Sequence, residues 1–201
     1  MIDLTQFTDS QNVVLFSYNN FQPWELIDNL DSILTRYMAT LGPDYVIENN
    51  TAIHKTATIE KGVTLKGTII ISENCFVGAH AYLRGPILLS NAVTIGPSSE
   101  VKQSIILDHS TIAHFNFIGN SILGQYVNFE AGSLCANHYN ERQDKRIMVQ
   151  YRNQIIDTKT EKFGALVGDH AKIGANAVLS PGTVLERNSV VKRLELVEQV
   201  K

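Results

Sequence analysis

The sequence predicts an all-β fold, a left-handed parallel β-helix built from hexapeptide repeats, and three observations lead to it. Aliphatic residues recur every six positions without a break, at Ile53, Ile59, Leu65, Ile71, Val77, Leu83, Leu89, Ile95 and Val101. Small or β-branched residues fall four places after each of them, from Ala57 to Ile105. The three- and four-residue spacing of an amphipathic helix is missing from the same stretch. A short repeat held over nine units is typical of a β-helix, in which each strand forms one side of a prism.

This repeat allows the position of a residue on the prism to be predicted from its place in the sequence. Three sides make one coil of about eighteen residues, so residues eighteen apart are expected to stack on the same face. The aliphatic residue of each unit is expected to point inward and fill the core.

Residues 1–50 are predicted to form an N-terminal helical extension. Pro23 and Glu25 are helix-start signals, an apolar stripe runs from Leu26 to Leu41, and Gly42 ends the stretch. We expect this helix to pack on the first coil and cap it, because the end of a solenoid otherwise leaves its core open.

Residues 51–192 are predicted to form the β-helix domain, followed by a C-terminal tail at 193–201. The repeat shifts by one residue around 105–118, and such irregularities often accompany functional sites. Residues 138–163 lack the repeat and are rich in charge, so they are predicted to be a loop insertion with a hairpin at 146–158. The insertion is expected to project and cover a binding site, either its own or that of a neighbouring subunit, and a surface loop that only supports the contact between subunits is the alternative.

Composition limits the classes of function. The 201 residues carry a formal net charge of −3, which gives no general attraction to nucleic acid or to an anionic membrane. No apolar run approaches the roughly 20 residues of a membrane span. The two cysteines, of which Cys75 falls on an inward position, favour a cytoplasmic location.

The stacking rule groups two basic residues. Arg84 and Lys102 are eighteen apart, so they are expected to lie on one face in successive coils as a two-cation site for phosphate or carboxylate. The alternative is two solvated basic side chains. His114 follows in the irregular segment, where an imidazole could act as a general base or be structural.

A metal site is a further alternative. His80, His109 and His114 invite comparison with the γ-class carbonic anhydrases, which bind zinc through three histidines on this fold. The spacing from His80 to the other two histidines does not match two whole coils. We therefore expect no metal.

The segments 113–137 and 166–184 resemble hexapeptide-repeat acyltransferases, in particular the acetyltransferase domain of bifunctional sugar-1-phosphate nucleotidyltransferases. The resemblance covers about residues 53–192. It places a phosphate-binding Arg and Lys on Arg84 and Lys102, the catalytic His on His114, and acceptor-contacting residues on Phe117 and Asn128.

The same resemblance implies roles for the remaining site residues. Asn137 takes the place of an Asn that orients the reactive groups. Ala131, Gly174 and Ala175 fall where the family lines the coenzyme A arm, and small side chains there are expected to leave room for it. The family's acceptor-contacting Tyr is Phe117 here. Its basic residue after Asn137 has no fixed counterpart, although Arg142 and Lys145 are candidates.

The resemblance implies a homotrimer that transfers an acetyl or other short acyl group from coenzyme A to the amine of a phosphorylated amino sugar. Transfer would be direct, with His114 as general base. Acetyl-CoA is the expected donor. A β-helix that binds sugar phosphate or nucleotide sugar without turnover is the alternative.

Overall fold

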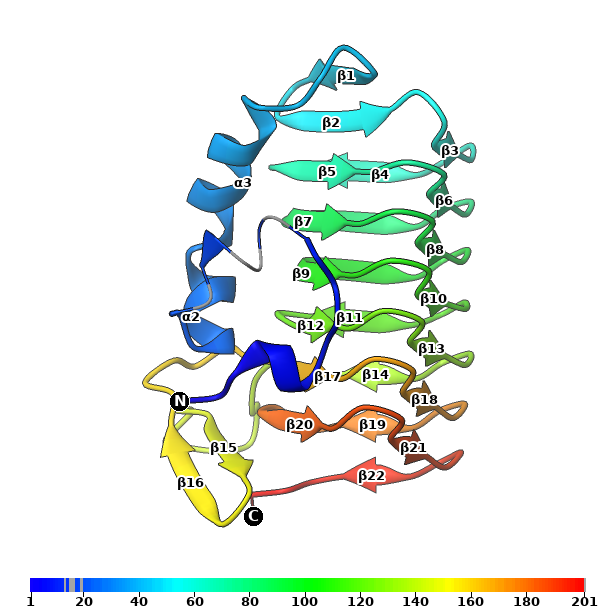
Figure 1. The fold of residues 1–201 in the computed structure, drawn as a ribbon. Helices are drawn as coiled ribbons and strands as arrows, with labels where there is room; N and C mark the ends of the chain where they lie inside the picture. Colours follow the sequence, from blue (N-terminus) through cyan, green and yellow to red (C-terminus); the bar gives the residue numbers. More distant parts are fainter. Residues whose placement is uncertain (13, 15–16, 19, 201) are drawn as a thin grey trace.

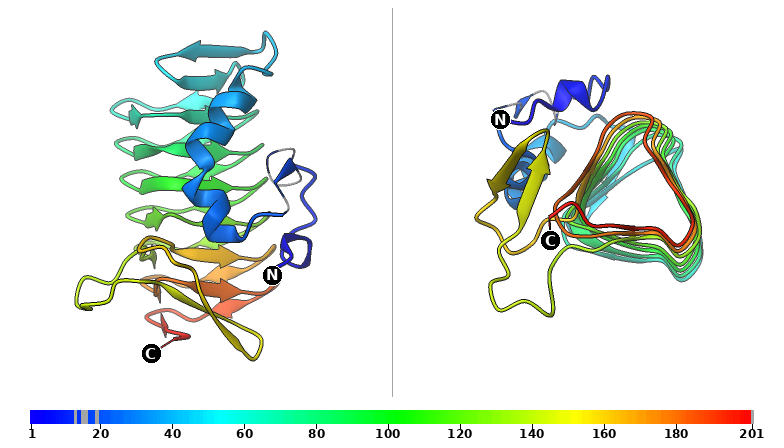
Figure 2. Two further views of the ribbon diagram at one scale, coloured as in Figure 1. Left: turned by 90° about the vertical axis from the view of Figure 1, so that its left-hand side faces the viewer. Right: turned by 90° about the horizontal axis from the view of Figure 1, so that it is seen from below.

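The computed structural model describes residues 1–12, 14, 17–18 and 20–200. Its main body is a left-handed parallel β-helix, in which short strands stack as the sides of a triangular prism (Figures 1 and 2). The predicted fold class is confirmed. Because each strand pairs with the strand one coil away, the backbone hydrogen bonds run along the axis and stabilise the stack.

The prism has three faces, each defined by a column of strands. Face 1 comprises β4 (Thr64–Lys66), the first halves of β7 (Tyr82–Leu89) and β9 (Glu100–Ile106), β11 (Phe117–Gly119), β14 (Leu134–Cys135), β19 (Val178–Leu179) and β22 (Leu196–Val197). Face 2 comprises β2 (Thr51–His54), β5 (Ile69–Ile71), the second halves of β7 and β9, β12 (Ile122–Leu123), β17 (Ala165–Val167) and β20 (Thr183–Leu185). Face 3 comprises β3 (Thr58–Ile59), β6 (Phe76–Val77), β8 (Thr94–Ile95), β10 (Thr111–Ile112), β13 (Asn128–Phe129), β18 (Lys172–Ile173) and β21 (Val190–Val191).

The register follows the predicted eighteen-residue coil and then shifts. Arg84 pairs with Lys102, eighteen residues on, whereas Lys102 pairs with Gly119, seventeen residues on. The predicted one-residue shift is therefore present. It keeps aliphatic side chains inside, because Ile118 and Leu123 remain fully buried on either side of a shortened corner.

The aliphatic repeat fills the interior of the prism. Inward residues such as Val77, Ile95, Ile112 and Ile173 are at most 1% exposed and belong to one continuous core. Burial of each such side chain contributes about 1.5–3 kcal/mol relative to exposure. Repetition of this contribution in each coil explains why a six-residue pattern alone specifies the fold.

The N-terminal extension lies along the side of the prism. The turn η1 (Leu4–Gln6) precedes α2 (Pro23–Asp28) and α3 (Leu30–Met38), and a capping box between Gln22 and Glu25 starts α2. The apolar face of the helices packs on the outward residues of face 2, including Ile70, Leu88 and Ile105. The predicted end cap was wrong. Face 2 carries aliphatic residues on its outer surface as well, and β1 (Tyr45–Glu48), antiparallel to β2, covers the end instead (Figure 1).

The insertion contains the predicted hairpin, formed by β15 (Met148–Tyr151) and β16 (Gln154–Asp157). The hairpin does not cover a face of the prism that carries polar site residues. It packs beside the N-terminal extension over face 2 (Figure 2), because Ile147, Val149 and Phe163 are fully buried in the same cluster as the helices. The segment before the hairpin protrudes near the corner between faces 1 and 2.

The β-helix continues beyond the predicted boundary at residue 192. Leu196 and Val197 form β22, which pairs with β19, so the expected tail is largely part of the last coil. Within the described residues, the helices are all too short or too polar to cross a bilayer.

Candidate functional site

Face 1 carries a column of three cations. Lys66, Arg84 and Lys102 pair in register on adjacent strands, one coil apart. The stacking rule placed Arg84 and Lys102 together correctly. Lys66 was missed, although it lies eighteen residues before Arg84 and the same rule identifies it.

Glu100 is the counterion of this column. The Nε of Arg84 donates to Oε1 of Glu100 at 2.8 Å, and its Nη2 contacts the same oxygen. The Lys66 ammonium and the Arg84 guanidinium both lie over the ring of Tyr82, at 5.2 and 5.7 Å from its centre. Arg84 is therefore held in place before any ligand arrives, and the charge of Glu100 also acts on Lys102.

A fourth cation approaches from the insertion. Desolvation lowers the pKa of Lys102, and the nearby charges of Lys162 and Arg84 lower it further, while Glu100 raises it. The environment therefore resists the charge on Lys102, and a bound anion would relieve that cost. Lys162 was not predicted, because its position in an irregular segment cannot be read from the repeat.

Phe117 lies in the next coil of face 1, over a position without a side chain. A Cβ built on Gly119 would come within 2.7 Å of Cζ of Phe117 and 2.9 Å of Cγ of Asn137. Gly119 thus allows the Phe117 ring to reach across to Asn137 directly beyond Lys102. The structure brings Arg84, Lys102, Phe117 and Asn137 to one region of face 1.

Asn137 is 5% exposed, and both polar atoms of its amide have a partner. Its Nδ2 donates to Oδ1 of Asn120 at 2.7 Å, and its Oδ1 lies 3.1 Å from Nδ1 of His138. The exposed imidazole of His138 is therefore oriented by a buried pair of amides. Sequence reasoning missed both Asn120 and His138. The signal for Asn120 was its seventeen-residue spacing from Asn137.

His114 lies at the corner between faces 3 and 1. Its exposed ring meets Phe115 edge-on, with centroids 5.7 Å apart. No described residue hydrogen-bonds the His114 imidazole. Since Asn137 lies at the opposite corner of face 1, a single chain does not bring these two predicted catalytic residues together.

Asn128 lies on face 3, away from the cations of face 1. It lines a groove of about 490 Å³ on the C-terminal coils together with Gly174, Lys172, Lys192 and Arg193. The structure therefore groups the predicted acceptor residue Asn128 with the predicted cofactor residue Gly174. The basic side chains around the groove suit a ligand with phosphates.

The residues predicted to line the cofactor arm are close together at the corner between faces 3 and 1. The N–H of Ala175 donates to Oε2 of Glu130 at 2.9 Å, and Glu130 also accepts from Arg193. Ala131 adjoins Glu130 in the preceding coil. The open space expected at Gly174 is not present. A Cβ there would lie 2.5 Å from the backbone N of Arg193, so the close approach of the next coil requires this glycine.

The histidines of the metal alternative lie at two different corners. His80 and His114 precede face 1, whereas His109 lies between faces 2 and 3. The ring of His109 stacks on Tyr126 at 4.8 Å, and Tyr126 stacks on His170 at 5.0 Å. Among the described residues, the three imidazoles therefore do not converge on one point.

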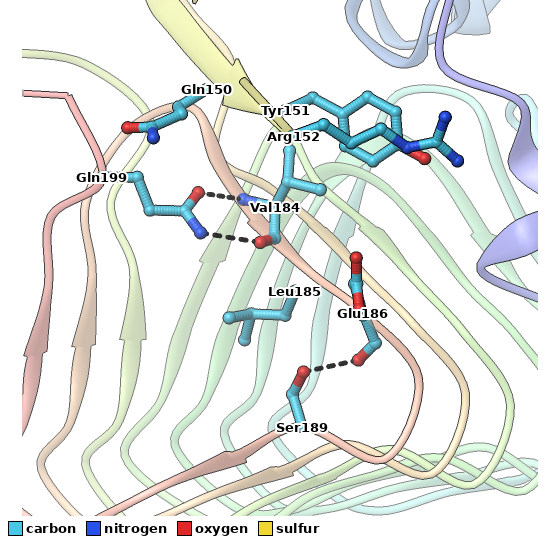
Figure 3. Close-up of a pocket in the computed structure, with 8 residues that line it drawn as sticks. All are labelled: Gln150, Tyr151, Arg152, Val184, Leu185, Glu186, Ser189 and Gln199. Atoms are coloured by element: carbon cyan, nitrogen blue, oxygen red, sulfur yellow. Dashed lines mark hydrogen bonds between the residues drawn. The ribbon is translucent and has the colours of Figure 1, made fainter. Parts of the chain in front are cut away.

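A separate cavity of about 360 Å³ lies between the hairpin and the last coil (Figure 3). The side-chain amide of Gln199 bonds both the N–H and the C=O of Val184 there, at 2.7 and 2.8 Å. This amide satisfies the backbone groups of Val184 at the end of face 2, where no further strand pairs with β20 among the described residues. The cavity contains none of the predicted site residues.

The two candidates for a basic residue after Asn137 differ in their contacts. Arg142 lies over the Tyr139 ring at 3.5 Å and its Nη2 is 3.6 Å from Glu198, so it belongs to the last coil. Lys145 is exposed in the protruding segment. Lys162 is the insertion residue whose charge acts on Lys102.

Comparisons with known proteins agree with this architecture. The family model described as the GMPPB C-terminal domain matches residues 46–156, and a hexapeptide repeat of succinyl-transferase matches residues 165–192. A bifunctional sugar-1-phosphate nucleotidylyltransferase/acetyltransferase of Sulfurisphaera tokodaii is 31% identical over 80% of this chain and 41% of its own length. The bifunctional protein GlmU of Methanococcus vannielii is 32% identical over 85% of this chain and 41% of its own.

Among solved structures, the chain is similar to the UDP-N-acetylglucosamine acyltransferase of Arabidopsis. It is 14% identical, has a TM-score of 0.36, and is matched over 77% of this chain and 62% of that chain. The chain belongs to the hexapeptide-repeat acyltransferase family. It spans about two-fifths of the length of the curated relatives described above.

Proposed function

We propose that the protein is an acyl-CoA-dependent N-acyltransferase whose acceptor is a phosphorylated amino sugar. The observation that carries this proposal is the column of Lys66, Arg84 and Lys102 on face 1, with Glu100 paired to Arg84. A phosphate monoester carries about −1.5 to −2 charges near neutrality, which matches three cations offset by one carboxylate. One curated relative is named as a bifunctional sugar-1-phosphate nucleotidylyltransferase/acetyltransferase, and another is named as the bifunctional protein GlmU. Both names support the same substrate class.

The donor is proposed to be an acyl-coenzyme A, acetyl-CoA first. Its phosphates would meet Lys172, Lys192 and Arg193 in the groove of face 3. The acceptor amine would attack the thioester carbonyl, so that a C–N bond forms, the C–S bond breaks, and the coenzyme leaves as its thiol. His114 would take the proton released by the attacking nitrogen and pass it to the departing sulfur.

The assembly that we propose is a homotrimer, and the distribution of these residues supports it. The anion site lies on face 1, Asn128 and the groove lie on face 3, and His114 lies at the corner between them. A site that uses all of them is completed where face 1 of one copy meets face 3 of another. Light scattering should then give three times 22.3 kDa, about 67 kDa. The donor and the two buried free thiols suit a reducing cytoplasm.

One observation favours the second candidate, a module that binds sugar phosphate without turnover. Within the described part of the chain, the His114 ring lacks the hydrogen-bond partner that usually orients a catalytic base. Turnover separates the two functions. Acetyl-CoA with glucosamine 1-phosphate should release free thiol, whereas acetyl-CoA with glucosamine should release far less. Binding of glucosamine 1-phosphate without thiol release would support the binding module. Failure to bind either glucosamine 1-phosphate or acetyl-CoA would contradict both functions.

A further inference from the structure

We infer that Lys162 is a binding residue for the acceptor's phosphate and that helix α2 positions it, so that the N-terminal extension sets the affinity of the anion site. This inference rests on the proposed function and adds to it a residue and a positioning element.

The segment that carries Lys162 is fixed to the corner that carries Lys102. The N–H of Asn120 donates to the carbonyl of Lys102 at 2.8 Å, and the N–H of Gly164 donates to the carbonyl of Asn120 at 3.0 Å. The N–H of Phe163 donates to the carbonyl of Asn137 at 3.1 Å. Lys162 therefore directly precedes the two residues that are bonded to Asn137 and Asn120, at the corner between faces 1 and 2.

Side-chain contacts hold the backbone before Lys162 as well. The Oγ1 of Thr158 donates to the carbonyl of Ile147 at 2.6 Å, and the N–H of Ile147 donates to the carbonyl of Thr160 at 2.9 Å. The N–H of Lys162 itself donates to Oγ1 of Thr160 at 3.3 Å. Lys162 is exposed, although the backbone on both sides of it is held by these hydrogen bonds.

Helix α2 contacts the segments of both lysines. The Trp24 ring, 4% exposed, meets the fully buried Phe163 ring edge-on at 5.9 Å, next to Lys162. The carbonyl of Ile27 accepts from Nε2 of Gln103 at 3.1 Å, next to Lys102. One six-residue helix therefore contacts the neighbour of each lysine, and the like charges of the two lysines act on each other.

The electrostatics agree with this geometry. Lys162 contributes more than Arg84 to the lowered pKa of Lys102, although Arg84 is its register partner. An anion between the lysines would be attracted by both, and loss of one should weaken binding by about tenfold, the factor that corresponds to 1.4 kcal/mol.

The test compares Lys162→Met with Lys159→Met, a control that removes a charge from the same insertion, and with Lys162→Arg. Calorimetry would measure the Kd of glucosamine 1-phosphate, of glucosamine and of coenzyme A for each folded protein. We expect Lys162→Met to bind the phosphorylated sugar about tenfold more weakly and to bind coenzyme A normally. Lys162→Arg should restore most of the affinity, and Lys159→Met should match wild type.

The positioning role is tested by a double-mutant cycle. Trp24→Phe keeps an aromatic ring but changes its reach, and it should weaken binding of glucosamine 1-phosphate in the wild-type background only. In the Lys162→Met background the same substitution should have no effect, because α2 then has no charge to position.

The outcomes separate the inference from the proposed function. Equal affinity of wild type for glucosamine 1-phosphate and glucosamine would overturn the proposed acceptor class. A wild-type preference for the phosphorylated sugar that Lys162→Met retains in full would overturn the role of Lys162. Additive losses from Trp24→Phe and Lys162→Met would overturn the positioning role of α2.

Discussion

Gly119→Ala is the sharpest test of the site on face 1. The backbone of Gly119 does not have a positive φ, so an alanine fits the local conformation. Its Cβ, however, would lie 2.7 Å from Cζ and 2.8 Å from Cε1 of Phe117, and 2.9 Å from Cγ of Asn137. All three atoms belong to side chains that we assign to the site, and no backbone atom is among them.

The size of the effect follows from these distances. Ordinary van der Waals contact begins near 3.4 Å, so Phe117 and Asn137 must each move by about half an ångström. A displacement of about 1 Å can cost a hundredfold in rate, so we expect about a tenfold loss of kcat/KM for the phosphorylated acceptor. Overpacking should also cost about 1–2 kcal/mol of stability, which lowers Tm by roughly 2–8 °C in a chain of this size.

Initial rates and a thermal melt would measure the two effects. Gly42→Ala is the matched control, because a Cβ at Gly42 has open space around it and its φ is not positive. The control should leave both the rate and Tm near wild type. If Gly119→Ala kept the wild-type kcat/KM while its Tm fell as expected, Phe117 and Asn137 would not contact the acceptor and our placement of the site would be refuted.

His114→Ala should lower kcat by about 10² to 10⁴ while the oligomer stays intact. His138→Ala should lower kcat less, and a larger loss of kcat in His138→Ala than in His114→Ala would assign the base to His138. Arg84→Ala should raise the Kd of the phosphorylated acceptor at least tenfold and spare coenzyme A, and loss of coenzyme A affinity instead would show that the two ligands have been assigned to the wrong faces. Because the pKa of Lys102 is lowered, its charge is present at neutral pH and lost as pH rises toward its usual range, so acceptor affinity should fall at alkaline pH earlier than an ordinary lysine would allow, and Lys102→Arg should abolish that early fall. A Gly/Ser linker in place of residues 140–160 should unfold the chain rather than merely open the site, because it removes buried Ile147 and Val149, and circular dichroism of a folded, active deletion would contradict this.

The insertion packs differently from what its sequence indicated. A charged, aperiodic stretch of this length indicated a projecting lid. In the structure, its few apolar residues, including Ile147, Val149 and Phe163, complete a second hydrophobic cluster with the N-terminal helices. No local pattern in the insertion showed where those residues would pack, because their partners lie far away in the sequence.

The sequence by itself determined the β-helix, its core and the stacking of Arg84 on Lys102. These features depend on a fixed period, and pairing of parallel strands converts that period directly into position. It also indicated the one-residue shift near 105–118, since a shift in the aliphatic positions is visible without coordinates.

The tertiary structure alone decided the features that depend on contacts outside the repeat. It placed the helices beside face 2 rather than over the end, since Ile70, Leu88 and Ile105 make that face apolar on its outer side. It brought the end of a long insertion, next to Lys162, to Asn137 and Asn120 through backbone hydrogen bonds. It also separated His114 from Asn137 by the width of a face. Repeat spacing fixes which residues share a column, whereas the path of the irregular segments depends on the whole folded chain.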